Sequence, residues 1–501
     1  MRKEQNTETD SLISTGVPGL DEILCGGLTR DRLYLVEGQP GSGKTTFGLQ
    51  FLVEGAKQGE RVLYISLAEN AVELRAVAAS HGLSMDGIQI HEVIPSESLL
   101  DPKEQYTMFH ASEVELGSTT QEILAAVEAV RPSRVVLDSL SELQLLADNP
   151  LRYRRQVLAY KQYFASRACT VLLLDDRTAS NADLQVHSIA HAVISLVQEA
   201  KEYGADRRRI RVSKYRGVEF RAGLHDYSIV RGGLVAYPRL VASTSRVTAR
   251  REQFATGLEE LDKLMGGGVE EGTSTLISGP PGTGKSSLAA QFVSAAVARG
   301  ERAAMFIFEE AANNLINRAE GLGMRLAAAL ESEQLTIQQI DPAELPPGEF
   351  AHSVCAAADR GAKVIVIDSL NGYLSAMPDE RFLTTHLHEL LTWLGQRGVV
   401  TVLVGVHQGL IGGNSVASVD ASYLADNVVL LRHYEADGEV RQAVSVFKKR
   451  GGPHERTLRE FSMSSRGIHV GPVLRQFHGI LTGVPTFRDG AQDGTGNGNA
   501  G

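Results

Sequence analysis

The sequence predicts two consecutive α/β domains, each built on a mostly parallel β-sheet that is flanked by helices. Three observations lead to this fold class. The chain repeats itself, β-rich apolar runs alternate with helical stretches, and a glycine-rich loop joins a strand to a helix in each repeat. The 501 residues also exceed what one hydrophobic core normally organises, so two domains are the simplest expectation.

The internal repeat sets the domain boundaries. The segments TGVPGLDEILCGG and TGLEELDKLMGGG begin at Thr15 and Thr256. The segments GERVLYISLAE and GERAAMFIFEE begin at Gly59 and Gly300. Both pairs are 241 residues apart with no insertion or deletion between them, which indicates two homologous domains. The predicted organisation is an N-terminal tail at 1–11, domains at 12–245 and 246–485, a polar linker at 243–251, and a disordered Gly-rich tail at 486–501.

Composition and charge exclude several classes of protein. The net charge is −10, which argues against a dedicated nucleic-acid binder. The three cysteines lie far apart and form no C-x-x-C pair, so neither a zinc site nor a disulfide framework is predicted. The longest apolar run, at 399–406, is far too short to span a membrane. We therefore expect a cytoplasmic protein without a membrane or nucleic-acid partner.

The elements follow the same order in each copy. In the first copy, the β-rich runs LYLVEG, VLYISL, RVVLDS and TVLLLD are separated by helical stretches such as TTFGLQFLVEGAKQG and STTQEILAAVEAVRP. Strands that alternate with helices are typical of a parallel sheet. A hairpin closes each copy, at 192–217 and at 428–451, with EYGAD and EADGE as the predicted turns.

Two glycine-rich loops predict nucleotide binding. The segments 38–45 and 279–286 read GQPGSGKT and GPPGTGKS, and both fit the P-loop pattern between a strand and a helix. Their glycines let backbone N–H groups face phosphates, and the helix N-terminus adds positive potential. A chance glycine-rich turn is the alternative, and two matches in register oppose it. The predicted ATP-binding residues are Gly41, Ser42, Gly43, Lys44, Thr45 and Thr46 in the first loop and Pro281, Gly282, Thr283, Gly284, Lys285, Ser286 and Ser287 in the second.

An aspartate ends a later apolar strand in each copy. Asp138 in VVLDS and Asp368 in VIVIDS lie where a Walker B acid is expected to hold Mg²⁺, directly or through water. The alternative is an aspartate that caps the following helix, and the occurrence in both copies favours the metal role. The predicted Mg²⁺ residues are Thr45, Asp138, Ser286, Glu309 and Asp368.

Glutamates follow the strand after each P-loop helix. The second copy has the adjacent pair Glu309 and Glu310, whereas the first has Ala68 and Glu69. Strand ends line the nucleotide crevice in such sheets, so a carboxylate there can orient the group that attacks the γ-phosphate. We predict that Glu309, Glu310 and Glu69 are catalytic. For Glu69, the alternative of a carboxylate that interacts with a helix dipole has nearly equal weight.

Paired cations lie near the end of each closing hairpin. Lys214 and Arg216 in KYRG correspond to Lys448 and Arg450 in KKRG. A solvated strand face is the alternative, but the repetition in register favours a function.

Taken with these features, the motifs carry a resemblance to a known family. Two RecA-like domains in tandem, each with a P-loop, Asp-Ser at Walker B and K-x-R-G after a hairpin, resemble the KaiC family of circadian clock ATPases. The resemblance extends over 14–485. The segments FEEAANNLINRAEGLGM and VFKKRGGPHERTLREF, at 308–324 and 446–461, are specific to this family beyond a generic P-loop.

The resemblance implies a two-tiered homohexamer with ATP, Mg²⁺ and subunit-interface sites. By position, Ser80 and Leu322 join the ATP-binding residues, and Leu322 stands where the family has an aromatic residue near the adenine. The implied contacts with a neighbour's nucleotide come from Lys214, Tyr215 and Arg216 in one tier and from Lys448, Lys449 and Arg450 in the other.

The resemblance also implies activity. The first domain of the family is mainly an ATPase, and the second is a serine/threonine kinase that phosphorylates itself on an adjacent Ser-Thr pair. That pair aligns with Ser422 and Tyr423, so the tyrosine departs from the family pattern. Ala68 is a second departure and predicts weaker hydrolysis in the first domain. The C-terminal tail shares nothing with the family's tail that recruits KaiA, so KaiA is not an expected partner, while a KaiB-like protein or a histidine kinase is a candidate.

Three functions stay open from the sequence. The leading interpretation is an autophosphorylating ATPase that acts in circadian-type timing or stress signalling. A RecA- or RadA-type DNA repair ATPase is opposed by the absence of a cysteine cluster and of aromatic–basic loops, and salt-dependent DNA binding would distinguish it. The third is a scaffold that binds ATP with little turnover, which multiple-turnover phosphate release would identify.

Overall fold

The computed structural model describes residues 12–93, 111–147, 149–176, 184–241, 252–375, 382–405, 421–480 and 486–487. The chain divides into two compact units, residues 1–239 and 240–501. The predicted linker and the N-terminal tail lie outside the described residues, as does most of the C-terminal tail. Thr486–Phe487, in the tail that was expected to be disordered, instead form β24, which pairs with β23 (Phe477–His478).

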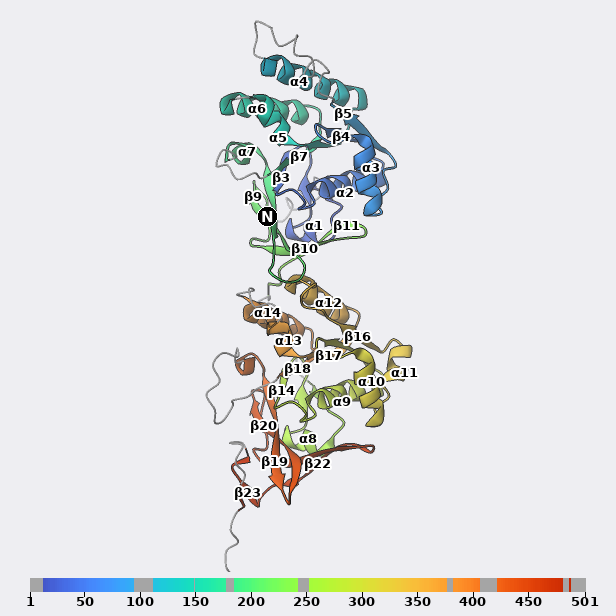
Figure 1. Ribbon diagram of the computed structural model, residues 1–501, viewed down its shortest axis with the longest axis vertical. Coiled ribbons are helices and arrows are strands. Elements are labelled where there is room, and N and C mark those ends of the chain that lie inside the picture. The colour runs from blue at the N-terminus through green and yellow to red at the C-terminus, as the bar shows by residue number, and fades with distance from the viewer. Residues whose placement is uncertain are drawn as a thin grey trace, which may run out of the picture. The chain divides into compact units, whose positions relative to one another are not determined.

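The described residues of the first unit form a nine-stranded sheet (Figure 1). Its strands are β3 (Leu33–Gly38), β4 (Val62–Ser66), β5 (Ile88–Glu92), β6 (Arg134–Asp138), β7 (Thr170–Asp176), β8 (Ala192–Glu199), β9 (Arg207–Tyr215), β10 (His225–Val230) and β11 (Gly233–Tyr237). The order is β11-β10-β9-β8-β3-β7-β6-β4-β5. In this spatial order, neighbouring strands are parallel from β8 through β3 to β5. Neighbouring strands are antiparallel from β8 to β11.

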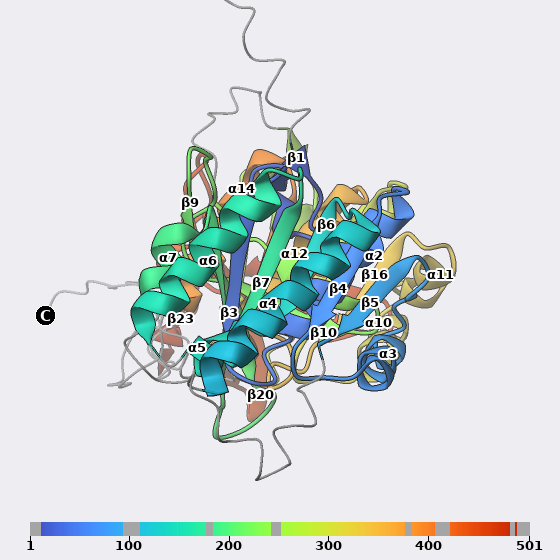
Figure 2. The same ribbon diagram turned by 90° about the horizontal axis from the view of Figure 1, so that it is seen from above.

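Helices cover both faces of this sheet. They are α1 (Leu20–Ile23), α2 (Lys44–Lys57), α3 (Ala71–Ser80), α4 (Ala111–Val130), α5 (Leu140–Ala147), α6 (Pro150–Ala165) and α7 (Leu184–Ile189). One hydrophobic cluster joins α1, α2 and α3 to one face, and another joins α4, α5 and α6 to the opposite face. Figure 2 shows α4 and α6 lying across the strands. Side chains alternate along β3, so Tyr34 packs in one cluster and Leu35 in the other.

The second unit repeats this topology strand for strand. Its sheet has the order β16-β15-β17-β18-β14-β19-β20-β21-β22, which corresponds to the first order read from β5 to β11. The strands are β14 (Ser274–Ser278), β15 (Arg302–Ile307), β16 (Leu335–Gln339), β17 (Ala362–Asp368), β18 (Val400–Gly405), β19 (Asn427–Ala436), β20 (Glu439–Lys449), β21 (Arg459–Ser464) and β22 (Gly467–Val473).

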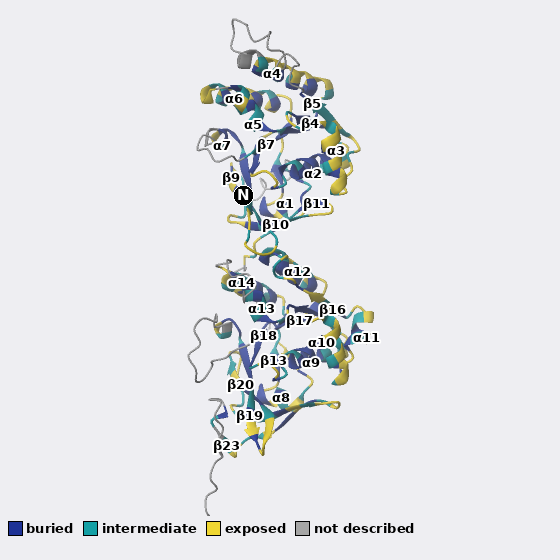
Figure 3. Ribbon diagram, viewed as in Figure 1, coloured by how far each residue is buried: buried dark blue, intermediate teal, exposed yellow. Residues whose placement is uncertain are grey.

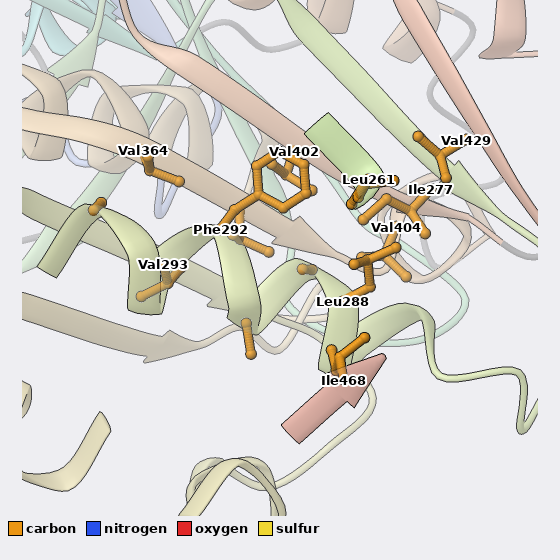
Figure 4. Close-up of a cluster of buried hydrophobic side chains, with 14 of the residues drawn as sticks. Leu261, Ile277, Leu288, Phe292, Val293, Val364, Val402, Val404, Val429 and Ile468 are labelled. Atoms are coloured by element: carbon orange, nitrogen blue, oxygen red, sulfur yellow. The ribbon is translucent and has the colours of Figure 1, made fainter. Parts of the chain in front are cut away.

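The helices of the second unit also cover both faces of its sheet. They are α8 (Glu259–Leu264), α9 (Lys285–Ala298), α10 (Ala312–Gly321), α11 (Leu326–Glu331), α12 (Pro347–Asp359), α13 (Leu370–Ser375) and α14 (Leu383–Gln396), with a 3₁₀ turn at Ala421–Tyr423. Figure 4 shows Phe292 and Leu288 of α9 among strand residues such as Val402. A short two-stranded sheet precedes each P-loop strand: β1 (Leu12–Ile13) with β2 (Leu28–Thr29), and β12 (Gln253–Phe254) with β13 (Val269–Glu270).

Burial explains why the parallel strands read as continuous apolar runs. The central strands are buried between two helical layers, whereas the outer faces of α3, α4 and α10 are exposed (Figure 3). This arrangement confirms the predicted fold class of two tandem α/β units with mostly parallel sheets. Among the described residues, no helix has the length and apolarity that crossing a membrane requires.

Candidate nucleotide sites

Each P-loop has the geometry that phosphate binding needs. The loop residues Gly43 and Gly284 both have φ 91°, a left-handed conformation that favours glycine, and each directly precedes a helix that begins at the P-loop lysine. Among the residues that the structure describes, no side chain caps α2 or α9, so their first amides have no capping side chain there. Uncapped N–H groups and the helix dipole together favour a bound phosphate.

The two P-loop lysines have different surroundings. Lys44 forms an ion pair with Asp176 Oδ1 at 2.7 Å and also donates to the Gly38 carbonyl at 2.9 Å. Lys285 donates to the Pro280 carbonyl at 2.8 Å, and its burial lowers its pKa. The first lysine therefore has a carboxylate partner that would compete with a phosphate.

The Walker B aspartates lie beside the P-loop hydroxyls. Thr45 Oγ1 donates to Asp138 Oδ2 at 3.1 Å, and Ser286 donates to Asp368 in the second unit. Burial is the main reason that the pKa of each aspartate is raised, and these hydrogen bonds oppose the shift. A hydroxyl beside a carboxylate is an oxygen-only donor set, which fits Mg²⁺. In both units the peptide bond after the aspartate is cis.

A tyrosine also binds the Walker B acid of the first unit. Tyr64 on β4 is fully buried, and its hydroxyl donates to Asp138 Oδ2 at 2.5 Å. The local sequence pattern does not single out this residue. The repeat contained a signal, because the position 241 residues later is Met305, which has no hydroxyl.

The glutamate pair of the second unit divides between two partners. Glu309 Oε1 accepts a hydrogen bond of 2.9 Å from Ser369 Oγ, next to Asp368. Glu310 forms a bidentate ion pair with Arg318, in which Nη2 donates to Oε2 at 2.8 Å. Glu309 therefore lies with the Walker B segment, while a guanidinium neutralises Glu310. Nothing in the local sequence pattern singles out Arg318.

Glu69 has a different environment in the first unit. Its Oε2 atom is buried and has no hydrogen-bond partner among the described residues. Burial, and then the charge of Asp138, raise the pKa of this carboxyl. The position that corresponds to Arg318 is Val77, which supplies no charge. The helix-dipole alternative is weakened, because Asn70 and Glu73 form the capping box of α3 instead.

The hairpin cations of the second unit bind the segment that contains Ser422. Lys448 Nζ donates to the Ser422 carbonyl at 2.9 Å and to the Ala425 carbonyl at 2.7 Å. Arg450 Nη2 donates to the Tyr423 carbonyl at 2.9 Å. The Ser422 side chain is half-buried, and Tyr423 is exposed. We call this arrangement of one lysine and one arginine on backbone carbonyls a carbonyl clamp.

The first unit has the same carbonyl clamp. Lys214 Nζ donates to the His187 carbonyl at 2.5 Å and to the Ala190 carbonyl at 2.8 Å. Arg216 donates to the Ser188 carbonyl. The clamped positions correspond, so His187 in the first unit occupies the place of Ser422 in the second.

Tyr215 and Lys449, which lie between the lysine and the arginine of each carbonyl clamp, contact backbone carbonyls of their own unit. The Tyr215 hydroxyl donates to the Gly27 carbonyl at 3.0 Å. Lys449 Nζ donates to the Met265 carbonyl and, at 3.2 Å, to the Gly268 carbonyl. These side chains fix the turn before the P-loop strand, and a contact with a neighbour's nucleotide stays a prediction for both.

The other predicted residues lie around the loops. Thr46, Ser287 and Thr283 are buried, and Ser42 Oγ is buried without a hydrogen-bond partner among the described residues. Ser80 ends α3 and donates to the Val77 carbonyl at 2.7 Å. Leu322 follows α10 and packs against the core.

Comparison with known proteins covers both units. Residues 13–241 and 254–475 match a family model described as "ATPase: KaiC". The circadian clock protein KaiC3 of Synechocystis sp. is 28% identical over 491 residues, which are 97% of this chain and 96% of that protein. KaiC2 of the same organism is 28% identical, over 96% of this chain and 85% of that protein. The circadian clock oscillator protein KaiC of Synechococcus elongatus is 25% identical, over 94% of this chain and 91% of that protein.

Proposed function

Because the chain belongs to the KaiC family of ATPases, we propose that it hydrolyses ATP and phosphorylates itself on Ser422, and that it acts in circadian-type timing or stress signalling. The proposal assigns the first unit to ATP hydrolysis and the second to autophosphorylation. Mg²⁺ would be held by Thr45 with Asp138 and by Ser286 with Asp368, and it would neutralise charge on the phosphates.

The proposed step is a phosphoryl transfer between subunits. The Ser422 oxygen attacks the γ-phosphorus of ATP bound to a neighbouring subunit, the bond from that phosphorus to the β–γ bridging oxygen breaks, and ADP leaves with the electron pair. The serine proton passes to Glu309 or Glu310 of that neighbour, since a serine hydroxyl needs a base. This step requires a homo-oligomer, which we propose to be a hexamer. A KaiB-like protein or a histidine kinase stays a predicted partner.

The carbonyl clamp is the observation that best supports this proposal. Lys448 and Arg450 hold the backbone carbonyls of Ser422 and of the residues that follow it, so the hydroxyl is presented at the start of a fixed segment. The same cations are those expected to meet a neighbour's nucleotide. Ser422 would therefore lie close to the γ-phosphate whenever the clamp residues reach it.

Peptide mapping tests the kinase assignment. Purified protein is incubated with Mg·ATP, and intact mass and peptide mass spectrometry are recorded. Phosphate is expected on the peptide that contains Ser422, and it should be absent from Lys285→Ala, which lacks the second P-loop lysine, and from Ser422→Ala. An unmodified Ser422 peptide from protein that hydrolyses ATP would contradict the kinase proposal. Phosphate on Tyr423 alone would also contradict it.

A scaffold with little turnover is the second candidate, and two observations favour it for the first unit. Ala68 removes one carboxylate from that site, and Asp176 pairs with the P-loop lysine. Multiple-turnover phosphate release in the Lys285→Ala variant isolates the first site. Turnover above that of a Lys44→Ala, Lys285→Ala double variant supports an ATPase, and its absence with retained ATP binding supports the scaffold.

A further inference from the structure

The Walker B acid of the first unit is fixed by two hydroxyls from two elements. Tyr64 on β4 and Thr45 on α2 both donate to the same atom, Asp138 Oδ2, at 2.5 and 3.1 Å. Two donors on one oxygen restrain the rotation of a carboxylate more than one donor does. Because Tyr64 is fully buried in the sheet core, its hydroxyl position is set by packing.

The Walker B acid of the second unit, Asp368, has different partners. Met305 replaces Tyr64 and packs in the hydrophobic core. Asp368 therefore has the Ser286 hydroxyl as its P-loop donor, and the Arg318 guanidinium acts on it from α10. The tyrosine is thus an addition of the first unit and not a requirement of the shared fold.

The charged groups around Asp138 affect whether its carboxylate is available to bind Mg²⁺. The charges of Lys44 and Asp176 act on Asp138, and the charge of Asp138 acts on Glu69. Ala68 stands where the second site has Glu309, so the first site lacks the carboxylate that lies with the Walker B segment in the second. Asp138 is the carboxylate that lies with the P-loop hydroxyl in the first site. A carboxylate that turned toward Lys44 would be lost to the cation.

We propose that Tyr64 is a positioning residue of the first nucleotide site, which holds the Asp138 carboxylate in the orientation that receives Mg²⁺ and thereby sets the Mg²⁺ requirement of this site. The inference rests on the proposed function only in that the first P-loop binds a Mg·nucleotide. It assigns no role in proton transfer to the tyrosine.

Nucleotide binding as a function of Mg²⁺ tests the proposal without measuring turnover. The binding of a fluorescent ADP analogue is titrated at a series of Mg²⁺ concentrations in the Lys285→Ala background, which leaves the first site. Partners in the outer shell of a metal site typically change metal affinity by roughly 10- to 100-fold when removed. Tyr64→Phe is therefore expected to raise the half-saturating Mg²⁺ concentration by about 10-fold. Tyr64→Met, which introduces the residue of the second unit, should do the same.

Tyr160→Phe is the matched control. Tyr160 is also a buried tyrosine of the first unit, but its hydroxyl is 3.3 Å from Thr120 Oγ1, on α6 and α4, away from the P-loop. Its removal should leave the Mg²⁺ requirement unchanged. A Tyr64→Phe titration that coincides with that of Tyr160→Phe overturns the proposal, as does one that moves to lower Mg²⁺.

Different results would refute the role of Tyr64 and the ATPase assignment of the first unit. If the parent protein releases no phosphate but Tyr64→Phe still raises the Mg²⁺ requirement for nucleotide binding, the ATPase assignment of the first unit fails and the role of Tyr64 stands. If the parent turns over ATP and Tyr64→Phe has no effect on the Mg²⁺ titration, the role of Tyr64 fails and the ATPase assignment stands. Mn²⁺ electron paramagnetic resonance with bound ADP provides a second readout of the same change.

Discussion

At the scale of single residues, three of the aligned positions at which the two nucleotide sites differ affect their carboxylates. Tyr64, Ala68 and Val77 in the first unit correspond to Met305, Glu309 and Arg318 in the second. Each difference changes the partner of a carboxylate: Asp138 gains a hydroxyl, Glu69 loses a neighbouring acid, and Glu69 also lacks the guanidinium that neutralises Glu310. The two sites therefore share their phosphate-binding backbone and differ in their acidic groups.

Glu69→Gln is expected to abolish most hydrolysis in the first site. The amide keeps the shape of the side chain but cannot orient water as a charged acceptor, and such groups typically contribute roughly 10²–10⁴ in rate. Phosphate release is measured in the Lys285→Ala background. Glu73→Gln is the control, since this exposed glutamate belongs to the capping box of the same helix. Equal rates for the two variants would remove Glu69 from the catalytic residues.

The double change Glu309→Gln, Glu310→Gln is expected to stop phosphorylation and hydrolysis in the second site, by roughly 10² or more. The single variants distinguish the two residues. Glu309 contacts the Walker B segment, whereas Glu310 is neutralised by Arg318, so Glu309→Gln should have the larger effect. Measurements in the Lys44→Ala background isolate this site, and unchanged phosphorylation in the double variant would refute the assignment.

The sequence predicted the chemical groups of these sites better than their pairing. The P-loops and the Walker B acids follow from spacing, because a strand, a turn and a helix place them with little freedom. The Glu310–Arg318 pair joins residues eight positions apart across a helix start, and the Tyr64–Asp138 bond joins two strands. Such contacts depend on side-chain packing, which local patterns do not contain. The repeat contains a signal for both, because Tyr64 aligns with Met305 and Arg318 aligns with Val77.

At the scale of elements, β6 carries an unusual buried charge. Arg134 is fully buried, and it donates to the Ser14 carbonyl at 2.8 Å and to the Phe51 carbonyl at 3.1 Å. Its charge is balanced by an ion pair with Glu60, which is mostly buried. Arg134 thereby links β6 to α2 and to the segment after β1. A buried cation is tolerated when it is paired and hydrogen-bonded, and it becomes costly when its partner is removed.

Glu60→Ala is therefore expected to destabilise the first unit by roughly 3 kcal/mol, which would lower its unfolding midpoint by several degrees. Differential scanning calorimetry measures this change. The repeat supplies the control: Glu301, at the corresponding position, pairs with Arg299 at 3.2 Å with both side chains partly exposed. Exposed pairs contribute about 0–1 kcal/mol, so Glu301→Ala should be nearly neutral. Similar shifts for both variants would contradict this account of Arg134.

The elements themselves were predicted well because each has a simple pattern. The apolar runs became the central strands, and the closing hairpins became β8–β9 and β19–β20. The sheet order could not be read from the sequence, since pairing of β3 with β7 and β8 depends on contacts between distant segments. The resemblance to the family, which the family model confirms over both units, predicted the tandem RecA-like domains but no order of strands.

At the scale of the whole molecule, the carbonyl clamp appears in both units with the same chemistry. In each, one lysine and one arginine at the end of a closing hairpin hold the backbone just before the strand beside the P-loop strand. Two units that keep the same clamp on different sequences, with His187 in one and Ser422 in the other, indicate that the clamp belongs to the fold. The side chain that it presents is what differs between the units.

ATP is expected to drive assembly through these cations. Lys214, Arg216, Lys448 and Arg450 lie far along the chain from their own P-loops, and in each unit they sit on a closing hairpin. A neighbour's γ-phosphate would add a charged partner that single subunits lack, so ATP would bind the assembled state more tightly and stabilise it by mass action. Light scattering with analytical ultracentrifugation should show a hexamer at micromolar protein with Mg·ATP, and smaller species without nucleotide.

Neutralising the clamp in one unit at a time tests whether both tiers contribute. Lys214→Met with Arg216→Met, or Lys448→Met with Arg450→Met, should raise the ATP concentration needed for assembly by roughly 10-fold or more, because each pair removes charge-assisted bonds to a phosphate. Arg211→Met with Arg441→Met removes the same number of charges from the same hairpins, at the exposed Arg211 and at the half-buried Arg441 beside the turn, and should assemble normally. A protein that stays monomeric at saturating ATP would refute the assembly, and a hexamer that tolerates both clamp variants would refute the role of the cations in it.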